Sequence, residues 1–147
     1  MVIGNRLGLE LASVDVLPDH EGGNGHTVFN TPKWFRPSAI RAGGPIGERD
    51  RNLIEAVVKT FLAGSVAEAR VSGFHNWAAA GFDLDAVARE WLGLLVPADQ
   101  LEARLEALNA EAEALVAAPE NWAAIERLAQ ALLERQRLTG EQARRYS

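Results

Sequence analysis

The order of apolar and polar residues divides the chain into a short N-terminal part with a strand-like period and a longer helical part. In the first stretch apolar residues alternate roughly with polar ones, at Leu9, Leu11, Val14 and Val16. This alternation predicts a half-buried strand that ends at Pro18. Residues 19–26, DHEGGNGH, contain glycines and an asparagine that permit positive φ, and they predict a turn before a second strand at 27–29. Because two strands alone are marginally stable in water, the hairpin should lie on the helices or pair with a further strand.

Residues 30–47 predict an irregular connection. The segment contains three prolines and three glycines, together with Trp34 and Phe35. Proline and glycine interrupt regular structure, so we expect the two aromatic side chains to hold this loop on the core. The alternative is that an aromatic loop of this kind lines a substrate cleft.

The longest helical pattern follows, from Glu48 to Gly73. Apolar or small residues recur there at three- and four-residue spacing, at Leu53, Ile54, Val57, Val58, Phe61, Leu62 and Ser65. This spacing is the period of one helix face. The small residues 63–65 would let another backbone approach closely, and Gly64 otherwise costs about 1 kcal/mol relative to alanine. Gly73 is a natural C-terminal stop.

A second helix is predicted from Asp83, after a tight connection that holds His75, Asn76 and Trp77. Its apolar face is formed by Leu84, Val87, Ala88, Trp91 and Leu95. Aspartate is among the best N-cap residues, and an acidic residue in the first turn, such as Asp85, suits the helix dipole. A carboxylate at position 83 therefore needs no catalytic role to explain it.

Two more helices, rich in alanine, leucine and glutamate, are predicted after Pro97. Their apolar stripes are Leu101, Leu105, Leu108, Ala112, Leu115 and Val116, then Trp122, Ile125, Leu128, Ala129, Leu132 and Leu133. Pro119 suits the first turn of the second helix, and Thr139 with Gln142 predicts a capping box for a short final turn. The pair could cover the central helices or form a dimer surface, and the need to bury the central helices favours cover.

The predicted fold class is therefore mainly α. We expect a single domain over residues 1–147, with a small hairpin and an irregular arm at 1–47 and a core of four helices at 48–147. A chain of 147 residues that is 48% hydrophobic and 24% charged fits one globular domain. It contains no cysteine, which excludes thiolate catalysis, cysteine zinc sites and disulfides.

The charge pattern argues against two classes of partner. The net charge is −5, and acidic and basic residues are interspersed without the basic stripe of a nucleic-acid-binding protein. The apolar runs are far shorter than the ~20 residues of a membrane helix. The first residues also lack the apolar core of a signal peptide. We therefore expect a cytoplasmic protein that binds neither nucleic acid nor membrane.

The turn of the predicted hairpin invites a metal interpretation, because it contains His20, Glu21 and His26. The zinc-peptidase motif HExxH needs two histidines four residues apart on one helical face. Here the histidines are six residues apart and glycines lie between them, so a solvated turn is favoured. His75 is near Asp83 in the sequence, and a surface or capping role is favoured for it as well.

Residues 61–88 carry a more specific pattern, in which FLAGSVAEAR is followed by VSG, by NW and by AAAGFDLDAVA. Residues 122–142, WAAIERLAQALLERQRLTGEQ, add a last helix with an L-x-G-E ending. These segments resemble the peptidase domain of the FtsH-type zinc metallopeptidases, and the resemblance covers most of the chain from Leu7. It implies that Asp83 occupies the position of the third zinc ligand. Gly81 and Phe82 depart from the small polar residues that usually precede this aspartate.

The first motif of that family, HExxH, does not occur in these 147 residues. In the family it supplies two histidine ligands and the glutamate that activates the zinc-bound water. Its helix then runs on through a few mostly apolar residues to a short turn and the first strand. MVIGNRLGLELASV resembles this continuation, with Met1 directly after the place of the second histidine. Either the chain starts a few codons too late, or it has lost its metal site.

The resemblance implies that the complete protein would use zinc to hydrolyse peptide bonds of a peptide or protein substrate. It would do so without an ATPase module, because no GxxxxGK[ST] string occurs. A catalytic zinc needs three protein ligands and a water, so we expect the 147-residue chain to be inactive. The alternative, from another class of function, is a non-catalytic helical module for protein binding or assembly.

Overall fold

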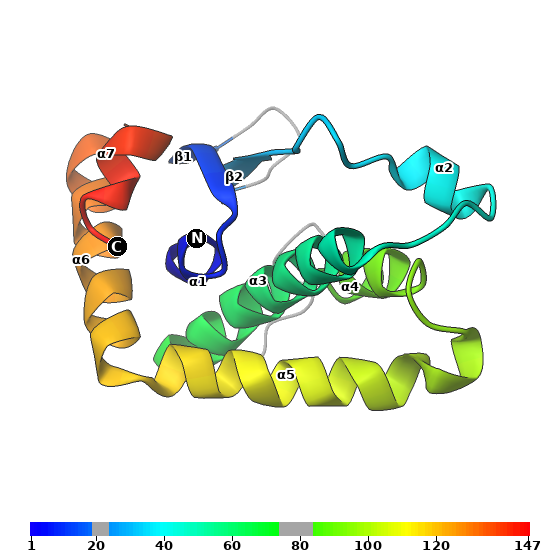
Figure 1. Cartoon of the computed structure of the whole chain (residues 1–147). Coiled ribbons are helices and arrows are strands. Elements are labelled where there is room, and N and C mark those ends of the chain that lie inside the picture. Colours follow the sequence, from blue (N-terminus) through cyan, green and yellow to red (C-terminus); the bar gives the residue numbers. More distant parts are fainter. Residues whose placement is uncertain (19–23, 74–83) are drawn as a thin grey trace.

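The computed structural model describes residues 1–18, 24–73 and 84–147. These residues form seven α-helices, one 3-10 helix and three strands (Figure 1). In chain order the elements are α1 (Val2–Arg6), β1 (Glu10–Pro18), β2 (Asn24–Asn30), α2 (Pro37–Arg41), α3 (Glu48–Ser72), α4 (Leu84–Leu92), η1 (Ala98–Gln100), α5 (Leu101–Ala117), α6 (Pro119–Arg135), β3 (Arg137–Thr139) and α7 (Gly140–Arg144). The predicted mainly helical class with a small hairpin is confirmed.

The ends of the long helices follow the local sequence. At the start of α3 the Asp50 carboxylate accepts a hydrogen bond of 2.8 Å from the Gly47 N–H. At its end Gly73 adopts φ 79°, a left-handed conformation that glycine takes without strain. Pro119 opens α6, and Thr139 with Gln142 forms the predicted capping box of α7. These boundaries agree with those expected from capping residues.

The hairpin belongs to a three-stranded antiparallel sheet of order β2-β1-β3. Val14 of β1 faces Thr27 of β2 on one side and Leu138 of β3 on the other. Gln136, with φ 62°, ends α6 and turns the chain back along β1. The sequence did not predict β3, although the hairpin was expected to need an additional strand or a helical support.

The prediction for residues 1–47 was incomplete, because this part also contains the two short helices α1 and α2. Each has five residues, which is too short for an apolar period to be recognised. Helices of this length are not stable alone, so contacts with the rest of the fold must hold them.

The buried apolar residues form two clusters. The larger one lies mainly between α3, α4 and α5, with Ile54, Val58, Leu92, Leu108 and Val116 among its members. The second lies between the sheet, α6 and α7, with Leu11, Val14, Leu128, Leu138 and Ala143 among its members. Helices α5 and α6 meet at a sharp corner, where the buried Asn121 side chain donates a 2.8 Å hydrogen bond to the Leu115 carbonyl (Figure 1).

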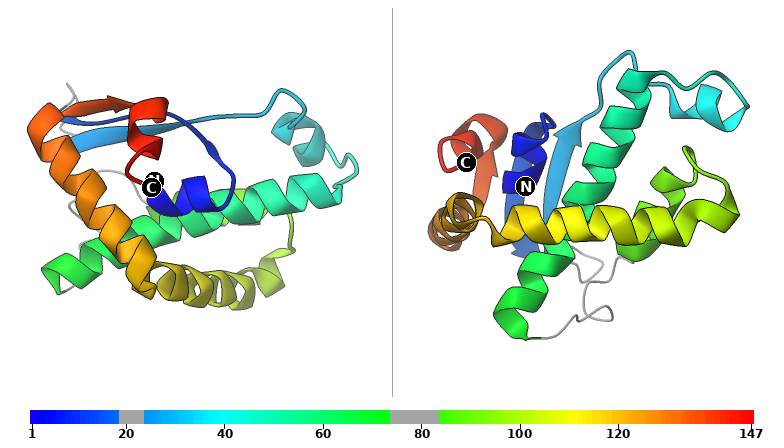
Figure 2. Two further views of the ribbon diagram at one scale, coloured as in Figure 1. Left: turned by 60° about the vertical axis from the view of Figure 1, so that its left-hand side comes forward. Right: turned by 60° about the horizontal axis from the view of Figure 1, so that its bottom comes forward.

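Helix α1 belongs to both clusters. Ile3 packs in the larger cluster and Val2 in the second, each with 2% of its surface exposed. Gly4 lies between β2 and α3, where an added Cβ would lie 2.7 Å from the Phe29 ring and 3.1 Å from the Thr60 methyl group. The short helix is therefore enclosed between the sheet and α3 (Figure 2).

The start of α7 lies against the backbone of β1. A Cβ on Gly140 would lie 1.7 Å from the Leu11 carbonyl oxygen and 2.6 Å from its carbon. No side chain fits at such a distance, so only glycine allows α7 to dock here.

Gly140→Ala should lower the free energy of unfolding by at least about 2 kcal/mol, because backbone must move to make room for the methyl group. Urea unfolding followed by circular dichroism measures this change. The control is Gly64→Ala, since no described atom lies within 4 Å of an added Cβ there and the residue is exposed on α3.

The control variant should be neutral or up to about 1 kcal/mol more stable, because alanine favours a helix over glycine. The sequence predicted that residues 63–65 allow another backbone to approach closely. Ala63 and Ser65 are buried, but Gly64 is exposed and no described atom lies near it. Equal effects of the two substitutions would contradict the close docking of α7 on β1.

Candidate functional site

Asp83, the predicted zinc ligand, lies outside the described residues, as do His75, Asn76 and Trp77. The structure does describe the two helices on either side of this segment. Helix α3 ends at Ser72, and α4 begins at Leu84, directly after Asp83.

Helix α4 is held firmly on the core along its second half. Ala88 and Leu92 have no exposed surface, and both belong to the cluster that α3 and α5 share. The Arg89 guanidinium forms an ion pair with Glu102 at the start of α5. The Arg89 hydrogen bond lowers the pKa of the Glu102 carboxyl below its usual value.

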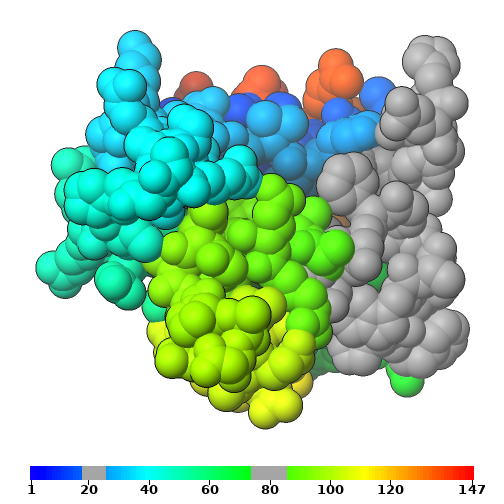
Figure 3. Space-filling model, turned by 90° about the vertical axis from the view of Figure 1, so that its right-hand side faces the viewer, coloured from blue at the N-terminus to red at the C-terminus, as the bar shows by residue number. Residues whose placement is uncertain are grey.

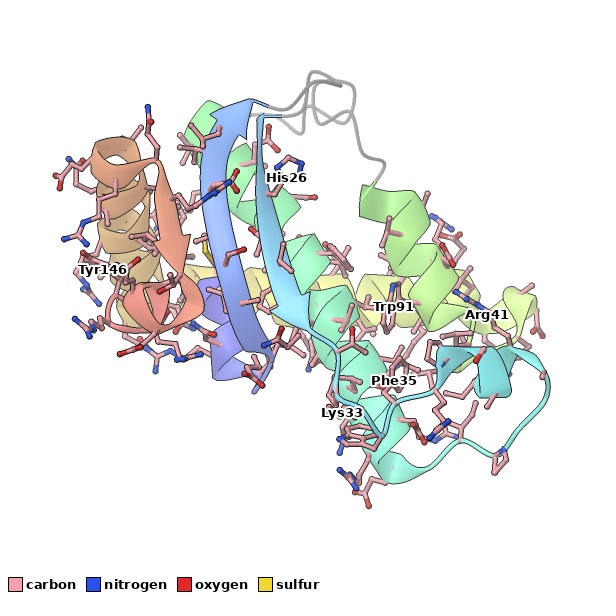
Figure 4. All side chains as sticks on the ribbon, turned by 90° about the horizontal axis from the view of Figure 1, so that it is seen from above. His26, Lys33, Phe35, Arg41, Trp91 and Tyr146 are labelled. Atoms are coloured by element: carbon pink, nitrogen blue, oxygen red, sulfur yellow. The ribbon has the colours of Figure 1, made fainter. Side chains whose placement is uncertain are left out.

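The arm, residues 31–47, packs against the other side of α4. The buried Phe35 ring stacks on Trp91, with ring centroids 5.6 Å apart and planes at 11°. Arg41 of α2 forms an ion pair of 2.6 Å with Glu90 (Figure 4). The structure thus supports the interpretation of an aromatic loop held on the core, and it shows that the partner of the loop is α4.

Helix α1 leads directly into the sheet. The Gly8 N–H donates to the Asn5 carbonyl and the Leu9 N–H donates to the Gly4 carbonyl, at 3.1 and 2.8 Å, and Gly8 adopts φ 83°. This tight turn connects the helix to β1. Figure 2 shows α1 running antiparallel to α3, with its N-terminus toward the end of the molecule where α3 finishes. Burial lowers the pKa of the Met1 amino group from 8.0 to about 6.

His26 is the one histidine in the described part of the chain, since His20 and the adjacent Glu21 lie outside it. Its Nδ1 lies 3.6 Å from Asp15 Oδ1 on β1, and Arg137 on β3 lies 3.4 Å from the other carboxylate oxygen. These side chains form a polar row across all three strands, which stabilises the sheet. Because Arg137 lies beside the second oxygen of Asp15, the row is poorly suited to a metal ion.

Within the described ranges no group of three histidine, cysteine, aspartate or glutamate residues could hold a metal ion. The same part of the chain contains no helix that is long and apolar enough to cross a membrane. No protein-family model, curated protein or solved structure matches the chain.

Sequence reasoning missed the contact between Phe35 and Trp91. Each of the two residues was expected to pack on the core. The sequence alone does not indicate that these two rings, more than fifty residues apart in the chain, contact each other. The only sequence signal is the presence of an aromatic residue in an otherwise irregular segment.

The buried amino group predicts a pH-dependent stability. Between pH 6 and 8 the unfolded chain binds a proton at Met1 that the folded chain does not bind, so stability should rise with pH in this window. The expected gain is about 2 kcal/mol, and below pH 6 the cost of burying the charge is fully present. Urea unfolding of the chain with Met1 retained, at pH 6 and pH 8, measures it.

The matched control is the same chain with an acetylated N-terminus, which cannot titrate there. The histidines contribute equally to both proteins, so the difference between them isolates the amino group. An identical pH dependence of the free and acetylated chains would contradict the burial of this group.

Proposed function

We propose that the chain is the scaffold of an FtsH-type zinc-peptidase-like domain, in which Asp83 is one zinc ligand. The residues that hold the other two ligands and the general base are not among these 147. The observation that best supports the proposal is the succession of a short buried helix, a tight turn and a first strand over Val2–Arg6 and Glu10–Pro18. This succession is the one that the resemblance to the family implies.

The direction of α1 supports the proposal further. Its N-terminus is oriented toward the end of the molecule where α3 finishes, and α3 is followed by the segment that contains Asp83 (Figure 2). Ile3 of α1 and Ala88 of α4 also belong to the same buried cluster. A helix that continued α1 upstream of Met1 would therefore extend toward the C-terminal end of α3.

The residues of this chain do not fit a catalytic zinc by themselves. Such an ion needs three protein ligands and an open position for water. The described residues contain no group of this kind, and the sequence contains no HExxH. We therefore assign no hydrolytic step to the chain alone, and we expect it to show no chelator-sensitive cleavage of casein when zinc is added.

The proposal is tested by supplying the missing motif. A helical segment that ends in HEAGH, fused directly before Met1, should create a site for one zinc ion together with Asp83. Zinc affinity measured by calorimetry should fall at least about tenfold in the fused protein when Asp83→Asn is introduced. The control is Asp85→Asn, two residues further along the chain, which should leave the affinity unchanged.

Circular dichroism would first establish that the fused proteins are folded. If they are folded and the Asp83→Asn and Asp85→Asn proteins bind zinc equally well, Asp83 is not a ligand and the proposal fails. Chelator-sensitive cleavage of casein by the original chain would contradict it as well.

The second candidate function is a non-catalytic helical module for protein binding or assembly, and the absence of HExxH from the 147 residues favours it. The coding sequence upstream of the Met1 codon distinguishes the two. An in-frame HEAGH-like string that ends there would support the peptidase scaffold, and a stop codon would support the non-catalytic module. For either function we propose a cytoplasmic location.

A further inference from the structure

The last turn of α1 is held by a residue from the other end of the chain. The Asn5 side chain donates a hydrogen bond of 3.1 Å to the Ser147 hydroxyl, and the Arg6 guanidinium donates one of 3.0 Å to the Ser147 carbonyl. We call these two hydrogen bonds the Ser147 clamp. Figure 1 and Figure 2 show that the two ends of the chain lie side by side. The clamp therefore joins the first helix of the chain to its last residues.

Ser147 is itself held by α7. Its N–H donates to the Arg144 carbonyl at 3.2 Å, and its hydroxyl donates to the Ala143 carbonyl at 3.4 Å. Ala143 has no exposed surface, and Gly140 places the start of α7 on the backbone of β1. The Ser147 hydroxyl thus donates to α7 and accepts from α1, so it connects α1 to the sheet through α7.

The Ser147 clamp restricts the direction of α1. A helix of five residues is only about 7.5 Å long, so a small movement of one end changes its direction appreciably. Val2 and Ile3 fix the first turn by packing in the two clusters. Apolar packing is not directional, whereas hydrogen bonds weaken steeply when they bend. The clamp therefore adds the directional contacts that packing alone does not supply.

We infer that Ser147 is a positioning residue for the segment that would carry the missing zinc motif. The inference rests on the proposed function, in which a helix continues α1 upstream of Met1. In HEAGH placed directly before Met1, the first histidine would lie about nine residues from Asn5, which is about 14 Å along a helix. A tilt of α1 by about 10° would then move this histidine by about 2 Å. Zinc–ligand distances tolerate deviations of only about 0.2 Å, so the direction of α1 decides whether a site forms.

Helix α4, which follows Asp83, has a separate restraint. The arm holds α4 through the stack of Phe35 on Trp91 and the ion pair of Arg41 with Glu90. Figure 3 shows the arm in cyan lying beside α4 in green. Loss of the Ser147 clamp should therefore loosen α1 and leave α4 as it is.

The first test measures amide hydrogen exchange by NMR in the 147-residue chain. Ser147→Ala removes the hydroxyl that accepts from Asn5. It should raise the exchange rates of the Asn5 and Leu7 amides, which donate to the Met1 and Ile3 carbonyls, about tenfold. Ser147→Thr keeps a hydroxyl at this position and should change these rates less than about twofold.

The matched control is Ser38→Ala, which removes a hydroxyl from an exposed serine of α2 and should leave α1 unchanged. The amides of α4 serve as an internal control in every protein. Equal acceleration along α1 and α4 in the Ser147→Ala protein would show a general loss of stability and would overturn the inference. Unchanged exchange along α1 would overturn it as well.

The second test measures zinc affinity by calorimetry in the protein with HEAGH fused before Met1. Ser147→Ala should weaken zinc binding about tenfold, and Ser147→Thr should weaken it less than about twofold. Unchanged zinc affinity despite faster exchange along α1 would overturn the positioning role. If Asp83→Asn leaves the zinc affinity unchanged, the proposed function fails, whereas the exchange rates decide independently whether Ser147 holds α1.

Discussion

The arrangement of the two cores depends on a helix of five residues. In α1, Val2 packs with the sheet and α6, while Ile3 packs with α3, α4 and α5. Gly4 lets this helix approach Phe29 and Thr60 more closely than any side chain would allow. Because neighbouring residues point into different clusters, a shift of α1 would disturb both at once. The helix is thus ordered by its surroundings and in turn fixes the sheet relative to the helices.

The C-terminal elements and the arm also pack against these two clusters. At the C-terminus β3 completes the sheet and α7 packs against β1, and the Asn5 side chain donates a 3.1 Å hydrogen bond to the Ser147 hydroxyl. On the other side the arm packs Phe35 on Trp91 and so restrains α4. The segment that contains Asp83 therefore follows one well-packed helix and precedes another.

The sequence predicted the features that repeat or that have local causes. The periods of α3, α5 and α6, the alternation in β1, and the caps at Gly73 and Thr139 all correspond to regular structure. Features that arise from long-range packing were missed, namely α2 as a regular element, β3, and the stack of Phe35 on Trp91. The helix α1 was expected only from the family resemblance and not from the apolar pattern. Composition cannot reveal them, because each is stabilised by residues far away in the sequence. The role of Asp83 came only from resemblance, since an aspartate at a helix start is equally well explained as a cap.

The proposal that Asp83 is a zinc ligand requires the N-terminus of α1 to face this residue. Because the chain contains no cysteine, Asp83→Cys provides a unique attachment site for a nitroxide spin label. Paramagnetic broadening of the amide NMR signals along α1 then measures which end of the helix is nearer to position 83. The account predicts the strongest broadening at Val2, with a steady decline toward Gly8. Stronger broadening at Gly8 than at Val2, or none along the helix, would contradict it.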